Sequence, residues 1–215
     1  MSNRAISIPP AVRRRGRPPK SENGYSETRE ALLQAGVEVL TEKGFSASSI
    51  EEILTKVGVP KGSFYHFFAS KEVFGSALIA RYDAYFSQKL DRFLLDESIV
   101  PLHRLRAFIK NAKSGMKRFN YRRGCLVGNL GQEMAHLPDA LRLQVRAVFE
   151  NWEGRVALCL EAAKHRGEIG RDADCKRLAA YFWIAWEGAV LRAKLDGAPK
   201  ALDIFEEFFF AGLPA

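Results

Sequence analysis

Residues 44–72 read GFSASSIEEILTKVGVPKGSFYHFFASKE, and this stretch decides the fold. Ser48 or Ser49 can cap a first helix, because a glutamate stands three residues after each serine and can return the hydrogen bond. Gly58 ends that helix after about two turns. Pro60 then suits the start of a second helix, which is too short to be stable alone. The pattern therefore predicts two short helices that need further packing.

A longer helix precedes this pair. Leu33, Val37 and Leu40 recur at helical spacing, and Gly44 provides a stop, so a helix is expected over residues 27–43. Two short helices that are joined by a glycine-containing turn and braced by a third helix form a helix-turn-helix. The second short helix of that motif enters the major groove of DNA.

The second short helix, residues 61–68, has two faces. Three of its residues have the spacing of core anchors: Phe64, Phe67 and Phe68. On the other face, Lys61 can reach a guanine edge, Gly62 lets the backbone approach closely, and Ser63 can bond to a base or a phosphate.

Three further polar residues are expected to hold phosphates and so fix the register on the duplex: Tyr65, His66 and Lys71. An alternative reading of Tyr65 and His66 is that they are ordinary half-exposed residues of a small packed helix.

The net charge of +8 is concentrated at one end of the chain. Residues 1–25 hold six Lys or Arg and a single acidic residue, within a Pro-rich and Gly-containing segment that has little apolar surface. We expect a disordered basic arm there. Arg15 and Arg17 flank a glycine and form a narrow strip suited to an A·T-rich minor groove. The alternative is a solvated tail with no DNA contact.

The composition also excludes several classes of protein. The longest uncharged apolar run, residues 178–186, is nine residues long, far short of the roughly 20 that span a bilayer. No apolar segment follows the first arginines, so no secretory signal is expected and the predicted location is the cytoplasm. Three widely spaced cysteines fit neither a disulfide framework nor a zinc site. Neither a metal nor a cofactor is expected.

With these residues in view, the stretches Gly44–Ser49, Val57–Phe68 and Ser70–Glu72 resemble the N-terminal domain of the TetR family of transcriptional regulators. The resemblance implies an all-α dimer with a helix-turn-helix head on each subunit and a larger C-terminal domain that binds a small inducer and dimerises. It implies these DNA contacts: Thr28, Ser49, Lys61, Ser63, Tyr65, His66 and Lys71.

The expected domains are a basic arm over 1–25, a DNA-binding head over 26–72, and a ligand-binding and dimerisation domain over 73–215. A connecting helix is predicted over 72–95. Further helices are expected over 101–120, 124–136, 138–166, 174–194 and 199–211, for about nine helices in all.

Cys125 is the most reactive thiol that the sequence suggests. Gly124 places it in the first turn of a helix, and Arg122 and Arg123 stand just upstream. A helix dipole and nearby cations both favour thiolate, so a lowered pKa and a raised reactivity are predicted. The alternative is a buried thiol that serves as a small hydrophobe.

Two segments, Arg122–Met134 and Phe182–Lys194, resemble those of acrylate-responsive repressors of dimethylsulfoniopropionate catabolism within the TetR family. Gly124-Cys125-Leu126 and Ala193-Lys194 are more distantly similar to repressors that sense electrophiles. The resemblance implies a small electrophilic or carboxylated inducer, with Cys125 as sensor and Lys194 as its partner. The predicted ligand-binding residues are Cys125, Asn129, Trp183, Trp186, Glu187 and Lys194.

Several choices stay open at this stage. The cation or amide that would hold a carboxylate is Asn129, Gln132, Arg155, Arg192 or Lys194. The aromatic cluster around Trp183 lines a pocket or forms the dimer core, and Phe205, Phe208 and Phe209 are either dimer contacts or internal core.

The function has alternatives too. A regulator that acts through oxidation or alkylation of Cys125 is one. An enzyme with nucleophilic Cys125 is the other, and it is disfavoured because the four histidines show no spacing that would supply a base.

Overall fold

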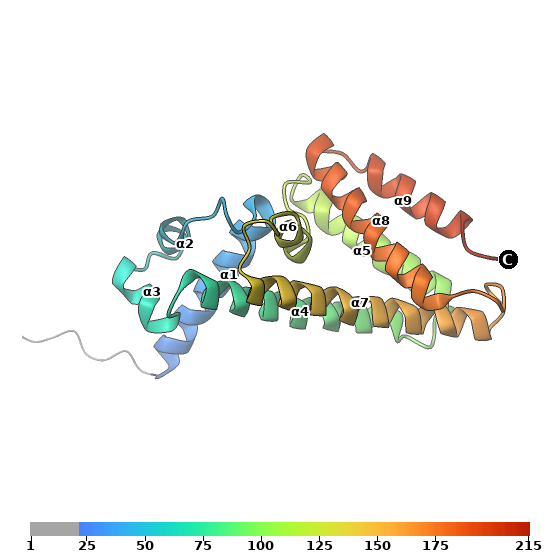
Figure 1. The fold of residues 1–215 in the computed structure, drawn as a ribbon, viewed down its shortest axis with the longest axis horizontal. Coiled ribbons are helices and arrows are strands. Elements are labelled where there is room, and N and C mark those ends of the chain that lie inside the picture. Colours follow the sequence, from blue (N-terminus) through green and yellow to red (C-terminus); the bar gives the residue numbers. More distant parts are fainter. Residues whose placement is uncertain (1–21) are drawn as a thin grey trace, which may run out of the picture.

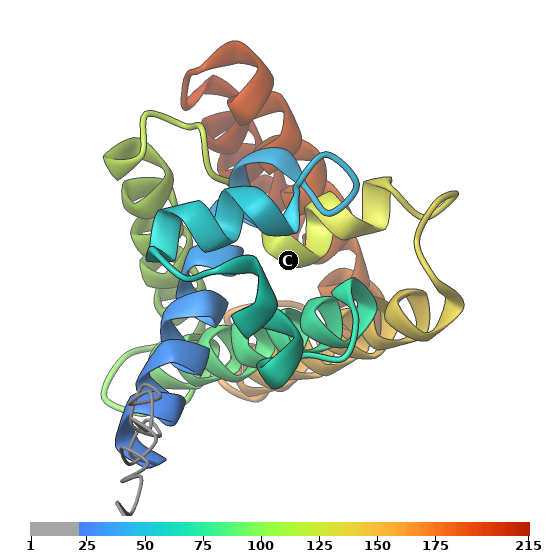
Figure 2. The same ribbon diagram turned by 90° about the vertical axis from the view of Figure 1, so that its left-hand side faces the viewer.

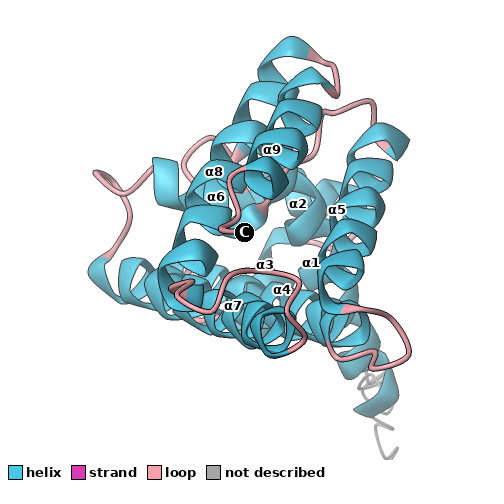
Figure 3. Cartoon of the chain, turned by 90° about the vertical axis from the view of Figure 1, so that its right-hand side faces the viewer, coloured by secondary structure: helices cyan, strands magenta, loops and turns pink. Residues whose placement is uncertain are grey.

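The computed structural model describes residues 22–215 of the chain, with side chains from Tyr25 onward. These residues form nine helices joined by loops (Figures 1 and 3). The all-α fold that the sequence predicts is therefore confirmed. Arg15, Arg17 and most of the predicted basic arm lie outside the described residues. The helices are α1 Glu22–Lys43, α2 Ile50–Val57, α3 Lys61–Phe67, α4 Lys71–Leu94, α5 Pro101–Arg118, α6 Leu126–Gln132, α7 Asp139–His165, α8 Cys175–Asp196 and α9 Lys200–Ala211.

The head consists of α1, α2 and α3. The hydroxyl of Ser49 accepts the backbone N–H of Glu52 at 3.1 Å and so caps α2, while Ser48 is buried; Ser49 is thus the capping serine of the pair. Gly58 ends α2 in the left-handed conformation at φ 71°, as the sequence predicts. The start of α1 differs from the prediction: it begins at Glu22 rather than at residue 27, so the last residues assigned to the arm are helical.

Phenylalanines hold the head to the connecting helix. Phe64 and Phe68 are buried, and the ring of each contacts Phe74 of α4 at centroid distances of 5.3 and 4.7 Å. Phe67 is only partly buried and packs against Tyr25 of α1 at 4.5 Å. Two of the three predicted anchors are therefore core, and the third closes the contact between α3 and α1.

Helix α4 runs from the head into the C-terminal domain, where it lies beside α7 (Figure 1). Trp152 of α7 is fully buried between them, and its indole N–H donates to Asp83 of α4 at 2.8 Å. Seen from the head end, α1, α2 and α3 lie in front of the helices of the C-terminal domain (Figure 2). Helix α4 is thus continuous between the two parts.

Helices α8 and α9 pack side by side (Figure 1), and each exposes large apolar side chains. Phe205 and Phe209 of α9 are buried against Phe182 of α8, whereas Phe208 is exposed. Phe205 and Phe209 are therefore internal core, and only Phe208 is left exposed for a dimer contact. The exposed stripe consists of Tyr181, Ile184, Leu191 and Leu195 on α8 and Ile204 and Phe208 on α9. We call it the α8–α9 stripe. Every helix within the described part of the chain is too short or too polar to cross a lipid bilayer.

Candidate functional site

The outer face of α3 carries polar side chains that point away from the head. Lys61, Gly62, Tyr65 and His66 are exposed, and Ser63 is half-exposed. A Cβ atom at position 62 would contact nothing within 4 Å, so the surface beside Gly62 is open. Lys61 pairs with Glu51 of α2 at 2.5 Å, but both side chains are about two-thirds exposed, and such a pair exchanges readily with a phosphate or a base edge. The face has the shape and the donors of a DNA-reading helix.

Two of the predicted contacts, Lys71 and Ser49, bond to backbone groups of the head. The ammonium of Lys71 donates to the carbonyls of Phe45 and Ser48 at 2.8 and 2.7 Å and lies over the Phe45 ring, and burial lowers its pKa. The Ser49 hydroxyl caps α2. Thr28 is partly buried on α1. Lys71 therefore fastens the turn between α1 and α2, a role that the sequence pattern did not indicate.

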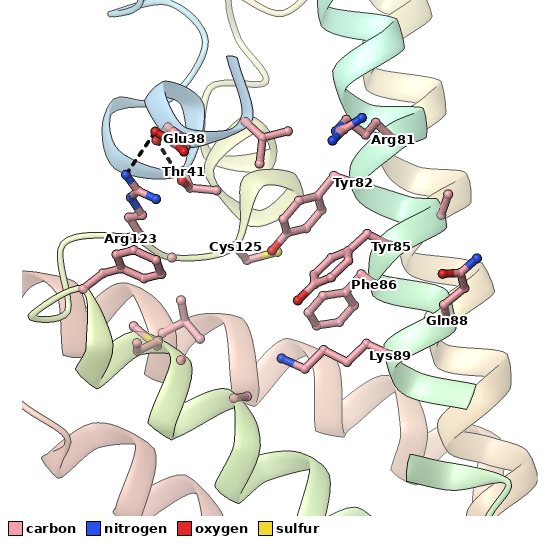
Figure 4. A pocket seen from close by; sticks show the side chains of 18 of the residues that line it. Glu38, Thr41, Arg81, Tyr82, Tyr85, Phe86, Gln88, Lys89, Arg123 and Cys125 are labelled. Carbon is pink, nitrogen blue, oxygen red and sulfur yellow. Dashed lines mark hydrogen bonds and ion pairs between the residues drawn. The ribbon is translucent and has the colours of Figure 1, made fainter. Parts of the chain in front are cut away.

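A cavity of about 610 Å³ lies where the head meets the C-terminal domain (Figure 4). One wall is α1 of the head, and the others come from α4, α5, α8 and the loop before α6. Its size is within the range of about 300–1,000 Å³ for small-molecule sites. The lining includes Thr41, Arg81, Tyr82, Phe86, Lys89, Met116, Arg123, Cys125, Trp186 and Val190.

Cys125 lines this cavity, and the pKa of its thiol is raised rather than lowered, which corrects the prediction. The residue is buried at the N-cap of α6, and its Sγ accepts the backbone N–H of Gly128 at 3.3 Å. Burial raises the pKa of the thiol well above its ordinary value, and the neighbouring Glu187 carboxylate raises it further. Arg123 does not compensate, because it bonds to Glu42 at 3.2 Å and Glu38 at 3.5 Å, and Arg122 is exposed.

Glu187 of α8 and Tyr82 of α4 complete the surroundings of the thiol. Burial raises the pKa of Glu187 to about 7, and contact with Cys125 partly offsets that rise. Glu187 Oε1 is buried with no hydrogen-bond partner in the described chain. The Tyr82 hydroxyl points toward Cys125 (Figure 4). Glu187, which the sequence predicts as a ligand-binding residue, therefore lies against Cys125 and outside the cavity lining.

We expect alkylation of Cys125 by iodoacetamide at pH 7.5 to be about tenfold or more slower than that of a free cysteine, because the thiolate is scarce. Glu187→Gln removes the negative charge beside the thiol, and it is expected to speed alkylation by about tenfold, the effect of one pKa unit. Mass spectrometry of the modified peptide over pH 7–10 gives the rates. A wild-type rate that levels off below pH 8 would contradict the raised pKa.

The two tryptophans of the predicted site lie in different places. Trp186 lines the cavity, whereas Trp183 lies behind Phe86 and Trp152 in the core, with ring centroids 6.0 and 5.1 Å away. The indole N–H of Trp183 is buried without a hydrogen-bond partner among the described residues. The structure therefore brings Trp186, but not Trp183, to the cavity wall.

Asn129 and Lys194 connect the ligand domain to the head. The side-chain amide of Asn129 donates to the carbonyls of Leu40 and Thr41, at 2.9 and 3.0 Å. Lys194 donates to Thr41, Glu42 and Asn129 at 3.2–3.3 Å. These bonds satisfy the last carbonyls of α1, where a cation is also favoured by the helix dipole.

Glu133 makes a third connection, which sequence reasoning missed. Its carboxylate accepts the backbone N–H groups of Phe45 and Ser46 at 2.9 and 2.6 Å. In the sequence, Glu133 is marked only by its position next to the end of α6. That position does not indicate that the turn after α1 packs against it. Together with Asn129 and Lys194, Glu133 forms what we call the α1 clamp.

The cations and amides that were predicted to hold a carboxylate lie outside the lining of this cavity. Arg155 pairs with Asp91 at 2.7 Å, Arg192 pairs with Asp196 at 3.0 Å, and Gln132 is exposed outside the cavity lining. Lys89 of α4, which the sequence analysis did not single out, lines the cavity instead. Within residues 25–215, no group of three His, Cys, Asp or Glu side chains is arranged to hold a metal ion.

Comparison with known proteins gives consistent results for both halves of the chain. The profile of "Bacterial regulatory proteins, tetR family" matches residues 32–77, and that of "Tetracyclin repressor-like, C-terminal domain" matches residues 101–209. The chain is 50% identical over 204 residues to the transcriptional regulator AcuR of Cereibacter sphaeroides, covering 94% of this chain and 93% of AcuR.

Two further similarities cover most of the chain. The transcriptional repressor NemR of Escherichia coli K12 is 30% identical over 184 residues, covering 82% of this chain and 89% of NemR. A crystal structure of a regulatory protein TetR from Rhodobacter sphaeroides superimposes with a TM-score of 0.85 at 49% identity, covering 86% of this chain and 98% of that one.

Proposed function

The chain belongs to the TetR family of bacterial regulatory proteins, and we propose that it is a repressor that a small molecule releases from its operator. Since its relatives are transcriptional regulators, the protein is a regulator and not an enzyme. The observation that carries the proposal is the cavity whose walls come from both α1 of the head and the helices of the C-terminal domain.

The functional boundary falls near residue 72, where α4 leaves the head. In the proposed division, residues 26–72 read DNA and residues 73–215 bind the inducer and dimerise. The DNA contacts are the outward residues of α3, with Thr28, Ser49 and Lys71 as supporting positions and Arg15 and Arg17 of the arm reaching the minor groove. In the free protein, Lys71 and Ser49 support the head from within.

The α1 clamp supplies a route from the cavity to the head. A ligand among α1, α4 and Cys125 pushes on the N-terminus of α6, and Asn129 and Glu133 on or next to α6 hold the end of α1. Displacement of α6 therefore pulls α1 and the turn before α2. This tilts α3 and changes the distance between the two heads of a dimer.

The proposed dimer forms through the α8–α9 stripe. Six large apolar side chains are exposed on adjacent helices, and such a patch marks an interaction surface. A two-fold dimer presents two α3 helices to one face of the duplex, so the operator is expected to be palindromic.

The proposed inducer is acrylate or a related carboxylated or electrophilic molecule, by similarity to AcuR and to the sequence segments around Cys125 and Lys194. Sensing through chemical modification of Cys125 is the second candidate, because the thiol reaches the cavity. Its raised pKa favours reversible binding over addition to the thiol. Retention of full responses to both acrylate and oxidants by Cys125→Ser would reject the second candidate.

Fluorescence anisotropy with the promoter upstream of the protein's own gene tests the proposal. We expect sequence-preferring binding that weakens steeply with salt, and a lower affinity when acrylate is added. A scrambled duplex is the control for sequence preference. Equal affinity for both duplexes would reject the repressor, and an unchanged affinity with acrylate would reject that inducer.

A further inference from the structure

Lys89 is a cation of the cavity that has no anionic partner in the described chain. Its side chain extends from α4 into the cavity and is half-buried (Figure 4). Its ammonium lies 5.9 Å from the centre of the Phe86 ring, a weak contact for a cation. By contrast, the other two cations of the lining are paired: Arg81 with Glu30, and Arg123 with Glu38 and Glu42.

The positive potential at Lys89 is reinforced by its neighbours. Arg92 and Arg118 lie close enough that, after burial, they are the next largest causes of the lowered pKa of Lys89. An anion bound at Lys89 would reverse this repulsion and restore an ordinary pKa. A charged group held at some cost and without a counterion points to a ligand that brings the opposite charge.

Apart from Lys89 and the hydroxyl-bearing Tyr85, much of this part of the cavity is apolar. Phe86 of α4, Ala112 and Met116 of α5, and Trp186 and Val190 of α8 line it. A single unpaired cation beside an apolar wall matches one negative charge on an apolar body. Phosphate groups are more often held by arginine forks or by several backbone N–H groups at a helix N-terminus. At the N-terminus of α6, Cys125 already accepts the Gly128 N–H.

We propose that Lys89 binds the carboxylate of the inducer, and that the ligand class is a monocarboxylic acid whose apolar part lies between α5 and Trp186. This inference rests on the proposed function, in which the cavity is the inducer site. The cavity volume of about 610 Å³ leaves room for acids longer than the three carbons of acrylate. Lys89 therefore sets the charge of the ligand, and the apolar wall sets its length.

Isothermal titration of the full-length protein with hexanoate and with hexanamide, its neutral counterpart, tests the role of Lys89. The wild type is expected to bind hexanoate at least about tenfold more tightly than hexanamide, as a charge-assisted hydrogen bond provides. Lys89→Gln is expected to lose about 10- to 100-fold in affinity for the acid and to bind the amide as before. Lys89→Arg should keep the preference for the acid.

Lys110→Gln is the matched control, because Lys110 is exposed on α5 and lines a different hollow. It should change neither affinity. Thermal unfolding of each variant checks folding. Equal loss of acid and amide binding in Lys89→Gln, or no preference for the acid in the wild type, would overturn the role of Lys89.

Failure of this inference can be told apart from failure of the proposed function. If a neutral molecule releases the operator while no acid binds, the Lys89 assignment is wrong and the repressor stands. If the protein shows no operator preference at all, the proposed function fails, and the Lys89 assignment to an inducer fails with it.

Discussion

A chain that carries Ile184→Glu and Leu195→Glu together is expected to be monomeric and to bind its operator about 100-fold or more weakly than the wild type. Linking two binding modules raises the overall affinity by roughly 10²–10⁴-fold over that of one module, and a monomer loses that gain. Light scattering with size-exclusion chromatography gives the mass in solution. Anisotropy with the promoter duplex upstream of the protein's own gene gives the affinity.

The two positions were chosen because they are exposed in the subunit. Ile184 and Leu195 are 72% and 76% exposed, so a glutamate at either position contacts solvent and costs the isolated subunit little. They are eleven residues apart on α8, which places them on one side of the helix, about three turns apart. In a dimer, two carboxylates per subunit would be buried without partners at the interface, which strongly disfavours association.

Leu143→Glu is the matched control, because Leu143 is 62% exposed on α7 and lies outside the α8–α9 stripe. It is expected to remain dimeric with unchanged operator affinity. If the double variant keeps the mass of a dimer, the stripe is not the interface. If it becomes a monomer but keeps its operator affinity, the hypothesis that both heads of a dimer bind one operator is wrong.

The helix boundaries could be predicted closely because their signals are local. Ser49 caps α2, Gly58 takes a left-handed conformation at the end of α2, and Pro101 starts α5. Each of these signals acts within a few residues of the chain. Two boundaries were missed: α1 begins at Glu22, where Gly24 weakens the helical pattern, and α6 ends at Gln132, four residues before the predicted end at residue 136.

The chemistry of the site depends on contacts between distant segments, and here prediction was weaker. The upstream arginines predicted a reactive Cys125, but Glu187, 62 residues further along, and burial by the surrounding helices raise the pKa. Lys89 was overlooked for the same reason. On its own helix it resembles any solvated lysine, and only the packing of α5 against α4, with α8 across the cavity, makes its position unusual.

The resemblance to a family supplied what local signals could not. It directed attention to Asn129, Lys194 and Glu187, and the structure brings all three near Cys125 or the end of α1. It placed Trp183 in the same set, whereas the structure assigns that residue to the core. Motif similarity therefore identified the region of the site, and side-chain packing distinguished the cavity wall from the support behind it.

Phe64→Ala is expected to lower the free energy of unfolding by about 3–5 kcal/mol and to abolish operator binding. Phe64 is fully buried in α3, and its ring contacts Phe68 and Phe74 at 5.5 and 5.3 Å. Its removal leaves a cavity at the point where α3 is held to α4. The loss is a large part of the roughly 5–15 kcal/mol that stabilises a domain. Urea unfolding followed by circular dichroism measures it.

Tyr65→Phe, one residue further along, separates reading DNA from folding. Tyr65 is 57% exposed, so loss of its hydroxyl should change the free energy of unfolding by no more than about 0.5 kcal/mol. If the hydroxyl bonds to a phosphate, operator affinity is expected to fall by about tenfold, because a hydrogen bond to a charged group is lost. Unchanged affinity would leave Tyr65 as an ordinary surface residue. A large loss of stability would instead mean that this face of α3 is packed, and that α3 does not present Tyr65 to the duplex.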